Sequence, residues 1–276
     1  MRKSLESLAE PNTGVCIGLD PDLSKFPLEL RKGTDAEQLF NFLAEVIELT
    51  KQHAASYKIQ KAFFDRYEGG TKTLKRVVDH LHSSFPERPV IIDCKIGDTV
   101  NTMRMYTELL FDYIDADGVT VNPFMGDDVF RSFKRYGDRG LAVLFRTSNR
   151  NAAPVQDVMV AHGEQSLPLW KHILDYALQN WNNDGNIIPV LSGHVDLEGI
   201  REKVGDDTPI LYAGIGMQGV DLQPMKHLLN SCNSGVFVNS SREILYPYTV
   251  DHPTWRSQIE NAATVLMHRI RGVKNG

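Results

Sequence analysis

The residues with the clearest chemical potential in this chain are one lysine and two aspartates that stand close together. Asp93 and Lys95 lie two residues apart at the end of an apolar run, residues 89–94, and Asp98 follows three residues later. Opposite charges favour the charged form of a lysine, while burial opposes it. An ammonium held between carboxylates can stabilise negative charge that develops on a substrate, and it can donate a proton there.

Short apolar runs alternate with longer amphipathic segments along the whole chain, which is typical of βα units around a parallel sheet. Strands are predicted at residues 13–19, 55–60, 89–94, 118–122, 141–145, 187–191, 209–213 and 235–239. Helices are predicted at residues 36–53, 71–81, 102–113, 129–135, 167–181, 197–204, 224–229 and 253–271. Eight such units, without a GxGxxG turn after the first strand, favour an α/β fold of the (β/α)8 barrel type.

The barrel is predicted to form a single domain over residues 1–276, with an insertion around residues 148–167 after the fifth strand. The Asn, Gly and Pro content of this insertion is compatible with a lid, a short helix or a loop.

Charged residues at the ends of the predicted strands gain significance in a barrel, because chemistry is located at the C-terminal ends of its strands. Asp20 follows the first strand and Lys58 lies within the second. Strand alternation places Asp93 and Lys95 on one face, pointing into the mouth beside Asp20 and Lys58. Two structural salt bridges that plug the barrel are an alternative explanation. Asp98 favours chemistry, because a plug does not require it.

A phosphate site is predicted at the other end of the chain. Residues 213–219, AGIGMQG, follow the seventh strand, and Arg242 follows the eighth. Free backbone N–H groups and an arginine fork after these two strands together satisfy a dianion.

Composition excludes several classes of protein. The net charge of −5 argues against non-specific binding of nucleic acid or of an acidic membrane surface. Cys16, Cys94 and Cys232 form no CxxC pair, so neither a disulfide framework nor a zinc ribbon is expected. No signal peptide, membrane span or HExxH metal motif is present, and the expected location is cytoplasmic.

Residues 93–102, DCKIGDTVNT, resemble the Asp-x-Lys-x-x-Asp-x-x-Asn-Thr signature of the orotidine 5′-phosphate decarboxylase family. Further segments resemble that family, especially its longer-chain subgroup, in the same order: GLDPD, YKIQKAFFD, RTSN, GIGMQG and NSSRE. The resemblance implies cofactor-free conversion of orotidine 5′-phosphate to UMP and CO2 in pyrimidine nucleotide synthesis.

The resemblance also implies roles for individual residues. Lys95 is expected to protonate C6 of the pyrimidine and Asp93 to sit beside the departing carboxylate, while Lys58 and Asp98 complete an alternating network of charge. Asp98 and Thr102 are expected to reach in from the partner subunit of a homodimer. The remaining substrate contacts are expected from Asp20 and Lys58 to the ribose, Ser148 to the pyrimidine edge, and Gly216, Gln218 and Arg242 at the phosphate.

Three alternative functions remain open from the residues themselves. A sugar-phosphate decarboxylase with the same Asp-x-Lys core would stabilise an enediolate with Mg2+, and chelation would abolish its activity. An aldolase would use Lys58 or Lys95 as a Schiff-base nucleophile, which borohydride would trap, although the carboxylates around Lys95 disfavour it. A non-catalytic nucleotide-binding barrel would show no turnover of orotidine 5′-phosphate.

Overall fold

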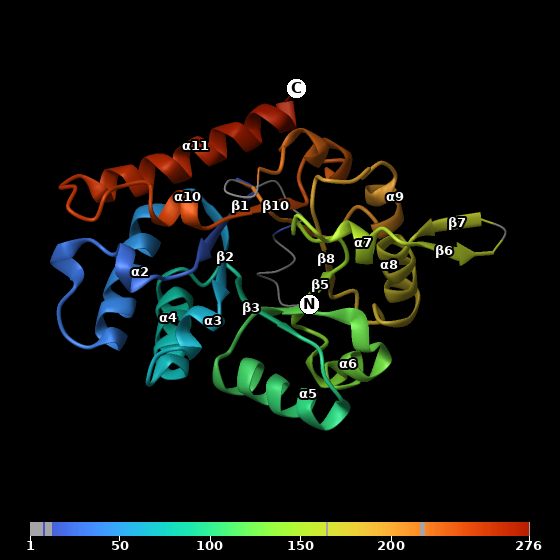
Figure 1. Ribbon diagram of the computed structural model, residues 1–276, viewed down its shortest axis with the longest axis horizontal. Helices are drawn as coiled ribbons and strands as arrows, with labels where there is room; N and C mark the ends of the chain where they lie inside the picture. The colour runs from blue at the N-terminus through green and yellow to red at the C-terminus, as the bar shows by residue number, and fades with distance from the viewer. Residues whose placement is uncertain (1–7, 9–12, 164, 216–218, 276) are drawn as a thin grey trace.

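The computed structural model describes residues 8, 13–163, 165–215 and 219–275. Within these residues, eight parallel strands close into a barrel in the order β1-β10-β9-β8-β5-β4-β3-β2 (Figure 1). The barrel strands are β1 (Val15–Leu19), β2 (Ala54–Gln60), β3 (Val90–Ile96), β4 (Gly118–Val121), β5 (Gly140–Leu144), β8 (Ile187–Leu191), β9 (Ile210–Tyr212) and β10 (Val236–Ser240).

Helices surround the barrel and cover the outer face of its sheet (Figure 1). The α-helices are α2 (Asp35–Thr50), α3 (Ala62–Asp65), α4 (Gly70–Ser84), α5 (Val100–Thr107), α6 (Asp127–Arg131), α7 (Ala153–Gln156), α8 (Leu169–Asn180), α9 (Ile200–Val204), α10 (Arg242–Leu245) and α11 (Trp255–Asn275). Shorter 3-10 or π turns are η1 (Leu23–Lys25), η2 (Leu28–Leu30), η3 (Glu108–Tyr113), η4 (Pro123–Met125), η5 (Lys134–Tyr136) and η6 (Gln223–Leu228). Among the described helices, none has the length and apolar character that crossing a bilayer requires.

Helix α2 shows how local sequence sets a helix and its orientation. The side chain of Thr34 caps the backbone N–H of Glu37, and the Glu37 carboxylate accepts from the backbone N–H of Thr34 in return. This reciprocal pair satisfies N–H groups that the first turn leaves without partners. Beyond it, apolar residues three and four apart are buried against the barrel: Leu39, Phe42, Leu43, Val46 and Ile47.

Two layers of core follow from the alternation of side chains along the strands. Ile17, Ile92 and Val238 face outward and pack with the helices. Cys16, Ile91 and Phe237, their sequence neighbours, belong to a second buried cluster inside the barrel. The barrel interior is therefore packed with side chains, as in other (β/α)8 barrels.

All eight predicted barrel strands are present, and β8 has the predicted bounds. The helices predicted at residues 36–53 and 197–204 are each three residues shorter at one end, since α2 ends at Thr50 and α9 begins at Ile200, and four others need correction. The predicted helix 102–113 starts at Val100 and becomes the π turn η3 after Thr107, and residues 224–229 form the 3-10 turn η6 in place of an α-helix. The predicted helix 129–135 divides into α6 and η5. The predicted helix 167–181 begins only at Leu169, because the residues before it form a strand.

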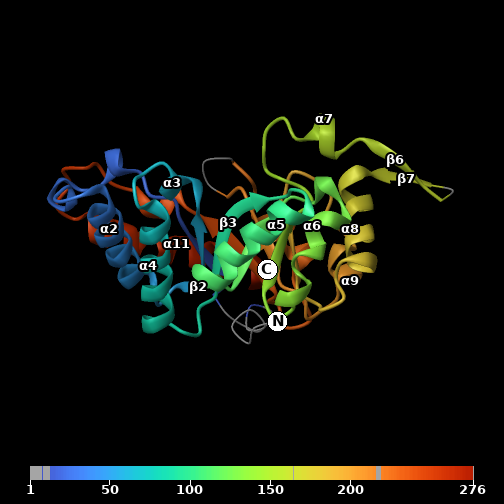
Figure 2. The ribbon, with the colours of Figure 1, turned by 90° about the horizontal axis from the view of Figure 1, so that it is seen from below.

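The insertion after β5 contains a short helix and a hairpin. Helix α7 is followed by the antiparallel strands β6 (Met159–His162) and β7 (Gln165–Pro168), which pair with each other only. The hairpin extends away from the barrel beside α8 (Figure 2). Of the three predicted forms, the short helix is therefore present, with a hairpin that the sequence analysis did not include.

Candidate active site

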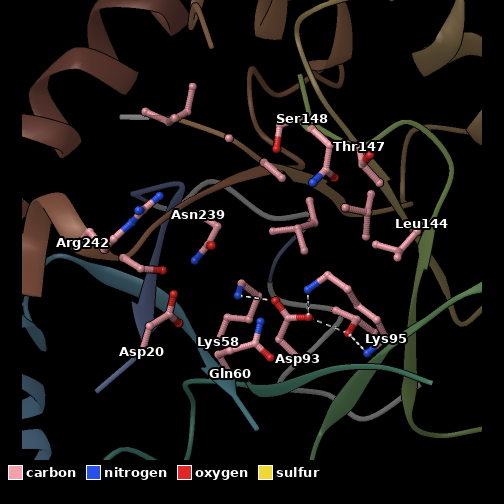
Figure 3. Close-up of a pocket in the computed structure, with 18 of the residues that line it drawn as sticks. Asp20, Lys58, Gln60, Asp93, Lys95, Leu144, Thr147, Ser148, Asn239 and Arg242 are labelled. Carbon is pink, nitrogen blue, oxygen red and sulfur yellow. Dashed lines mark hydrogen bonds and ion pairs between the residues drawn. The ribbon is translucent and has the colours of Figure 1, made fainter. Parts of the chain in front are cut away.

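A cavity of about 300 Å³ opens at the C-terminal ends of the barrel strands (Figure 3). Its charged and polar lining comes from many strands: Asp20, Lys58, Gln60, Asp93, Lys95, Thr120, Thr147, Ser148, Asn149, Asn239, Ser241, Arg242 and Glu243. Apolar side chains that include Leu144, Val190 and Ile215 complete the wall. A partly open cavity with convergent charged groups suits a small polar ligand.

The inward-facing positions change from apolar to polar as the strands approach the cavity. On β3, Ile91 is packed inside the barrel and Asp93 lines the cavity. On β10, Phe237 is packed inside and Asn239 lines the cavity. Alternation places residues i and i+2 on one face, so each strand carries its own transition from core to site.

Asp93 lies between two lysines at the centre of this site. Its Oδ2 accepts from Lys58 Nζ at 2.6 Å and its Oδ1 accepts from Lys95 Nζ at 2.6 Å (Figure 3). The side chains of Lys58 and Asp93 are each 8% exposed, whereas that of Lys95 is 48% exposed. Asp93 thus holds one buried and one accessible ammonium.

The electrostatic environment keeps Lys58 and Asp93 ionised. Burial alone would raise the pKa of Asp93, but the charges of Lys58 and Lys95 and their hydrogen bonds hold that pKa well below its ordinary value. Burial would likewise lower the pKa of Lys58, but the negative charges of Asp93 and Asp20 raise it above its ordinary value. The pair therefore remains charged across the physiological pH range.

Asp20 approaches Lys58 from the end of β1. Its Oδ1 is buried and has no hydrogen-bond partner among the described residues. A buried carboxylate oxygen without a partner is costly, so this atom is available to accept a hydrogen bond from a ligand hydroxyl.

The wall formed by Thr147 and Ser148 is held in place by the insertion. The buried guanidinium of Arg146 makes a bidentate pair with Asp157, with distances of 2.7 Å and 2.9 Å. The backbone N–H of Thr147 donates to Gln156 Oε1 at 2.9 Å. Both anchoring residues come from α7 and the residue after it, so the insertion braces one wall of the cavity.

Arg242 lies at the start of α10, across the cavity from Lys95 (Figure 3). Gly214 follows β9 and lines the same cavity with a φ of 96°, a conformation that favours glycine. A Cβ on Gly214 would lie 2.3 Å from the Cβ of Ser148. The predicted phosphate residues Gly216 and Gln218 lie outside the described residues.

Asp98 and Thr102 do not line the cavity of their own chain. The Asp98 carboxylate accepts from the backbone N–H of Thr99 at 2.7 Å, and Thr102 lies on α5. The other predicted residues within the described part of the chain, Asp20, Lys58, Asp93, Lys95, Ser148 and Arg242, all meet at the cavity.

The sequence analysis gave no role to seven polar residues of the lining, and three of them lie on the barrel strands. Gln60 and Asn239 could have been found by extending strand alternation, because Gln60 is two residues after Lys58 and Asn239 shares a face with Phe237. Thr120 is a single polar residue within the short buried strand β4, and its Oγ1 donates to Asp93 Oδ1 at 2.8 Å. No sequence signal distinguishes it from an ordinary β-branched strand residue.

Comparisons with known proteins agree with this geometry. Residues 13–247 match the model of the orotidine 5′-phosphate decarboxylase / HUMPS family. Proteins named orotidine 5′-phosphate decarboxylase are 34% identical over 96% of this chain and 96% of their own length in Bordetella petrii, and 37% identical over 85% of each in Dechloromonas aromatica. The structure of Leishmania donovani OMP decarboxylase is 26% identical, with a TM-score of 0.79 over 99% of this chain and 98% of that one. The chain therefore belongs to the orotidine 5′-phosphate decarboxylase / HUMPS family.

Proposed function

We propose that this chain decarboxylates orotidine 5′-phosphate to UMP and CO2, with the Lys95 ammonium as the proton donor to C6. The C6–carboxylate bond breaks, its electron pair stays on C6, and a proton from Lys95 Nζ forms the new C–H bond. The neutral amine then regains a proton from water. The observation that carries this assignment is the position of Asp93, which holds Lys58 and Lys95 at 2.6 Å each at the cavity.

A fixed ammonium suits this reaction because the pyrimidine ring does not readily delocalise the electron pair left on C6. Two unit charges about 4 Å apart interact by about 4 kcal/mol at an effective dielectric of about 20. Enzymes lower barriers by about 8–23 kcal/mol, so Lys95 supplies only part of what is needed. Binding of the remote phosphate, used to orient the ring, supplies a further part.

The roles of the other lining residues follow from the resemblance to the family, and the positions of the described ones in the cavity are compatible with these roles. Arg242, across the cavity from Lys95, is assigned to the phosphate. Gly216 and Gln218, which lie outside the described residues, are assigned to the phosphate from the resemblance of the sequence to the family. Asp20, with its buried Oδ1, and Lys58 bind the ribose hydroxyls. Ser148 contacts the pyrimidine edge from the wall that Arg146 and Asp157 brace. This arrangement spans the nucleotide from its base to its phosphate.

The active form is proposed to be a homodimer in which Asp98 and Thr102 enter the partner's site. Apolar side chains near them are exposed on this chain: Phe124 is 81% exposed, and Met105 and Met125 are each 49% exposed. Met105 shares α5 with Thr102, and Phe124 and Met125 follow β4, the neighbour of β3. Burial of this surface in a dimer is favourable.

The catalytic assignment is tested by following the loss of absorbance of orotidine 5′-phosphate. The wild-type chain is expected to turn over, and Lys95→Ala is expected to lose turnover while binding UMP with little change in affinity. Near-normal decarboxylation by Lys95→Ala would exclude Lys95 as the proton donor. Absence of turnover by the wild-type chain would refute the proposed reaction.

The dimer is tested by mixing two inactive variants, Lys95→Ala and Asp98→Ala. If Asp98 acts across a two-fold interface, half of the randomly formed dimers are hybrids with one intact site, so about one quarter of all sites regain activity. If Asp98 acts within its own chain, each hybrid site carries one substitution and the mixture stays inactive.

A further inference from the structure

The pairing of β3 with β4 is irregular next to Lys95. Ile92 pairs with Val119, but the next paired residues are Ile96 and Val121, so β3 carries extra residues over this interval. Such a bulge removes backbone N–H groups from the ladder. Here the N–H groups of Cys94 and Lys95 both donate to Thr120 Oγ1, at 2.9 Å and 2.8 Å.

The hydroxyl proton of Thr120 is committed to the catalytic carboxylate. Thr120 Oγ1 donates to Asp93 Oδ1 at 2.8 Å, the same oxygen that accepts from Lys95 Nζ. A hydroxyl has one proton and two lone pairs, and all three are used. One buried side chain thus holds the backbone of Lys95 and also the acceptor of its ammonium.

The backbone of Lys95 needs such support because its φ is 44°. The other non-glycine residues with positive φ in the described part of the chain are Asp115 and Asn233, which are types that tolerate this region. A lysine there is unfavourable and persists only when its surroundings enforce it. The two hydrogen bonds from Cys94 and Lys95 to Thr120 supply that constraint.

We infer that Thr120 is a positioning residue for the decarboxylation, acting through Lys95 and Asp93 rather than on the substrate. This inference rests on the proposed function, because it takes Lys95 as the proton donor. Loss of the hydroxyl leaves two backbone N–H groups without an acceptor, so the bulge relaxes and the ammonium moves. A displacement of about 1 Å in a reacting group can reduce a rate by about 100-fold.

The test compares Thr120→Val, which keeps the shape and removes the hydroxyl, with Thr120→Ser, which keeps the hydroxyl. Thr120→Val is expected to lower kcat about 100-fold while changing KM less than about threefold, because substrate contacts elsewhere remain. Thr120→Ser is expected to retain kcat within about threefold of wild type. Thr50→Val is the matched control, since Thr50 is a fully buried threonine whose hydroxyl bonds to the Val46 carbonyl, away from the cavity.

A crystal structure of Thr120→Val separates this inference from the proposed function. We expect Lys95 to leave its positive φ and its Nζ to leave Asp93 Oδ1, whatever the substrate is. An unchanged Lys95 backbone, or a kcat loss no larger than that of Thr50→Val, would overturn the inference. If wild type does not decarboxylate orotidine 5′-phosphate, the reaction assignment fails while the structural comparison still decides the role of Thr120.

If Thr120→Val does not fold, Thr120→Cys takes its place. A thiol is a weak hydrogen-bond acceptor and donor, and its C–S bond is longer than the C–O bond of the hydroxyl. Its kcat is expected to fall while that of Thr120→Ser is retained. A wild-type kcat for Thr120→Cys would contradict the inference.

Discussion

The substitution Asp93→Asn tests whether Asp93 keeps a buried cation in the folded state. It preserves the shape of the side chain and removes the negative charge between Lys58 and Lys95. The Lys95 side chain is 48% exposed and can turn its ammonium toward water. The Lys58 side chain is 8% exposed, so the cost of losing the Asp93 carboxylate falls on Lys58, where the charge of Asp20 offsets part of it.

The size of this cost has two limits. Removing one partner of a buried ion pair typically costs about 3–5 kcal/mol. Lys58 can also lose its proton in the folded variant. Because pH 7 is about 3.4 units below an ordinary lysine pKa and each unit corresponds to about 1.36 kcal/mol, this proton loss costs about 4.6 kcal/mol. The free energy of unfolding at pH 7 is therefore expected to fall by about 3–5 kcal/mol.

The same reasoning fixes the pH dependence of the loss. In the wild type, the raised pKa of Lys58 keeps its proton bound in the folded state, and this stabilisation is lost only as the pH rises above the ordinary lysine range. In Asp93→Asn, a neutral Lys58 makes the unfolded chain bind more protons, so the stability of the variant rises with pH. Proton loss from an ordinary lysine costs about 1.9 kcal/mol at pH 9 and about 4.6 kcal/mol at pH 7, so the destabilisation is expected to be smaller at pH 9.

Urea unfolding at pH 7 and pH 9, followed by the fluorescence of the buried Trp170 and Trp255, measures both values. The double variant Lys58→Met/Asp93→Asn is the control, because replacing both charges removes the unpaired cation and restores most of the stability. An equal loss at the two pH values, or a double variant less stable than Asp93→Asn, would refute this account.

Three further substitutions test other parts of the site. Arg242→Ala is expected to lower kcat/KM by about 10–100-fold, the value of a charge-assisted hydrogen bond, mainly through KM; wild-type kinetics would remove Arg242 from the phosphate site. Asp157→Ala leaves the buried guanidinium of Arg146 without its carboxylate partner and should lower the free energy of unfolding by about 3 kcal/mol. This value is the low end of the range for buried ion pairs, because the side chain of Asp157 is 29% exposed. Gly214→Ala places a Cβ 2.3 Å from the Cβ of Ser148, on a backbone with positive φ that favours glycine. KM should therefore rise, and urea unfolding should show about 1–3 kcal/mol of destabilisation. An unchanged KM would contradict the assigned contact of Ser148 with the substrate.

The barrel and the gathering of charged residues at its mouth could be predicted because they depend on local patterns. Short apolar runs between amphipathic segments mark the strands, and parallel strands in a barrel bring their C-terminal ends to one side. Asp20, Lys58 and Asp93 therefore meet although they are far apart in sequence. Strand ends were less predictable, since β3 continues two residues beyond its predicted end at residue 94.

The relation of Asp93 to Lys95 could be predicted only in part. Regular alternation places both side chains on one face, and both do line the cavity. The backbone between them is not a regular strand, however, because β3 bulges between Ile92 and Ile96 and Lys95 has a positive φ. Whether a bulge forms depends on the hydroxyl that the neighbouring strand presents, here that of Thr120, and no pattern within residues 89–98 contains that information.

The insertion shows the same limit for a different reason. Its hairpin pairs only with itself, so its strands have no core face and no strong alternation of apolar residues. The link between Arg146 and Asp157 joins the end of β5 to the residue after α7. Such a pair becomes evident only when the path of the loop is known.

The two lysines of the site differ in a way that divides their roles. Lys58 is buried, its Nζ is bound to Asp93, and the charges of Asp93 and Asp20 raise its pKa, so it holds its proton too firmly to be an efficient acid. Lys95 shares the same carboxylate but faces open space in the cavity. A group that must deliver a proton to substrate needs that access, whereas a group that fixes Asp93 needs the burial. The asymmetry in burial, more than the alternation of charge, therefore supports the proposal that Lys95 is the donor and Lys58 the anchor of the network.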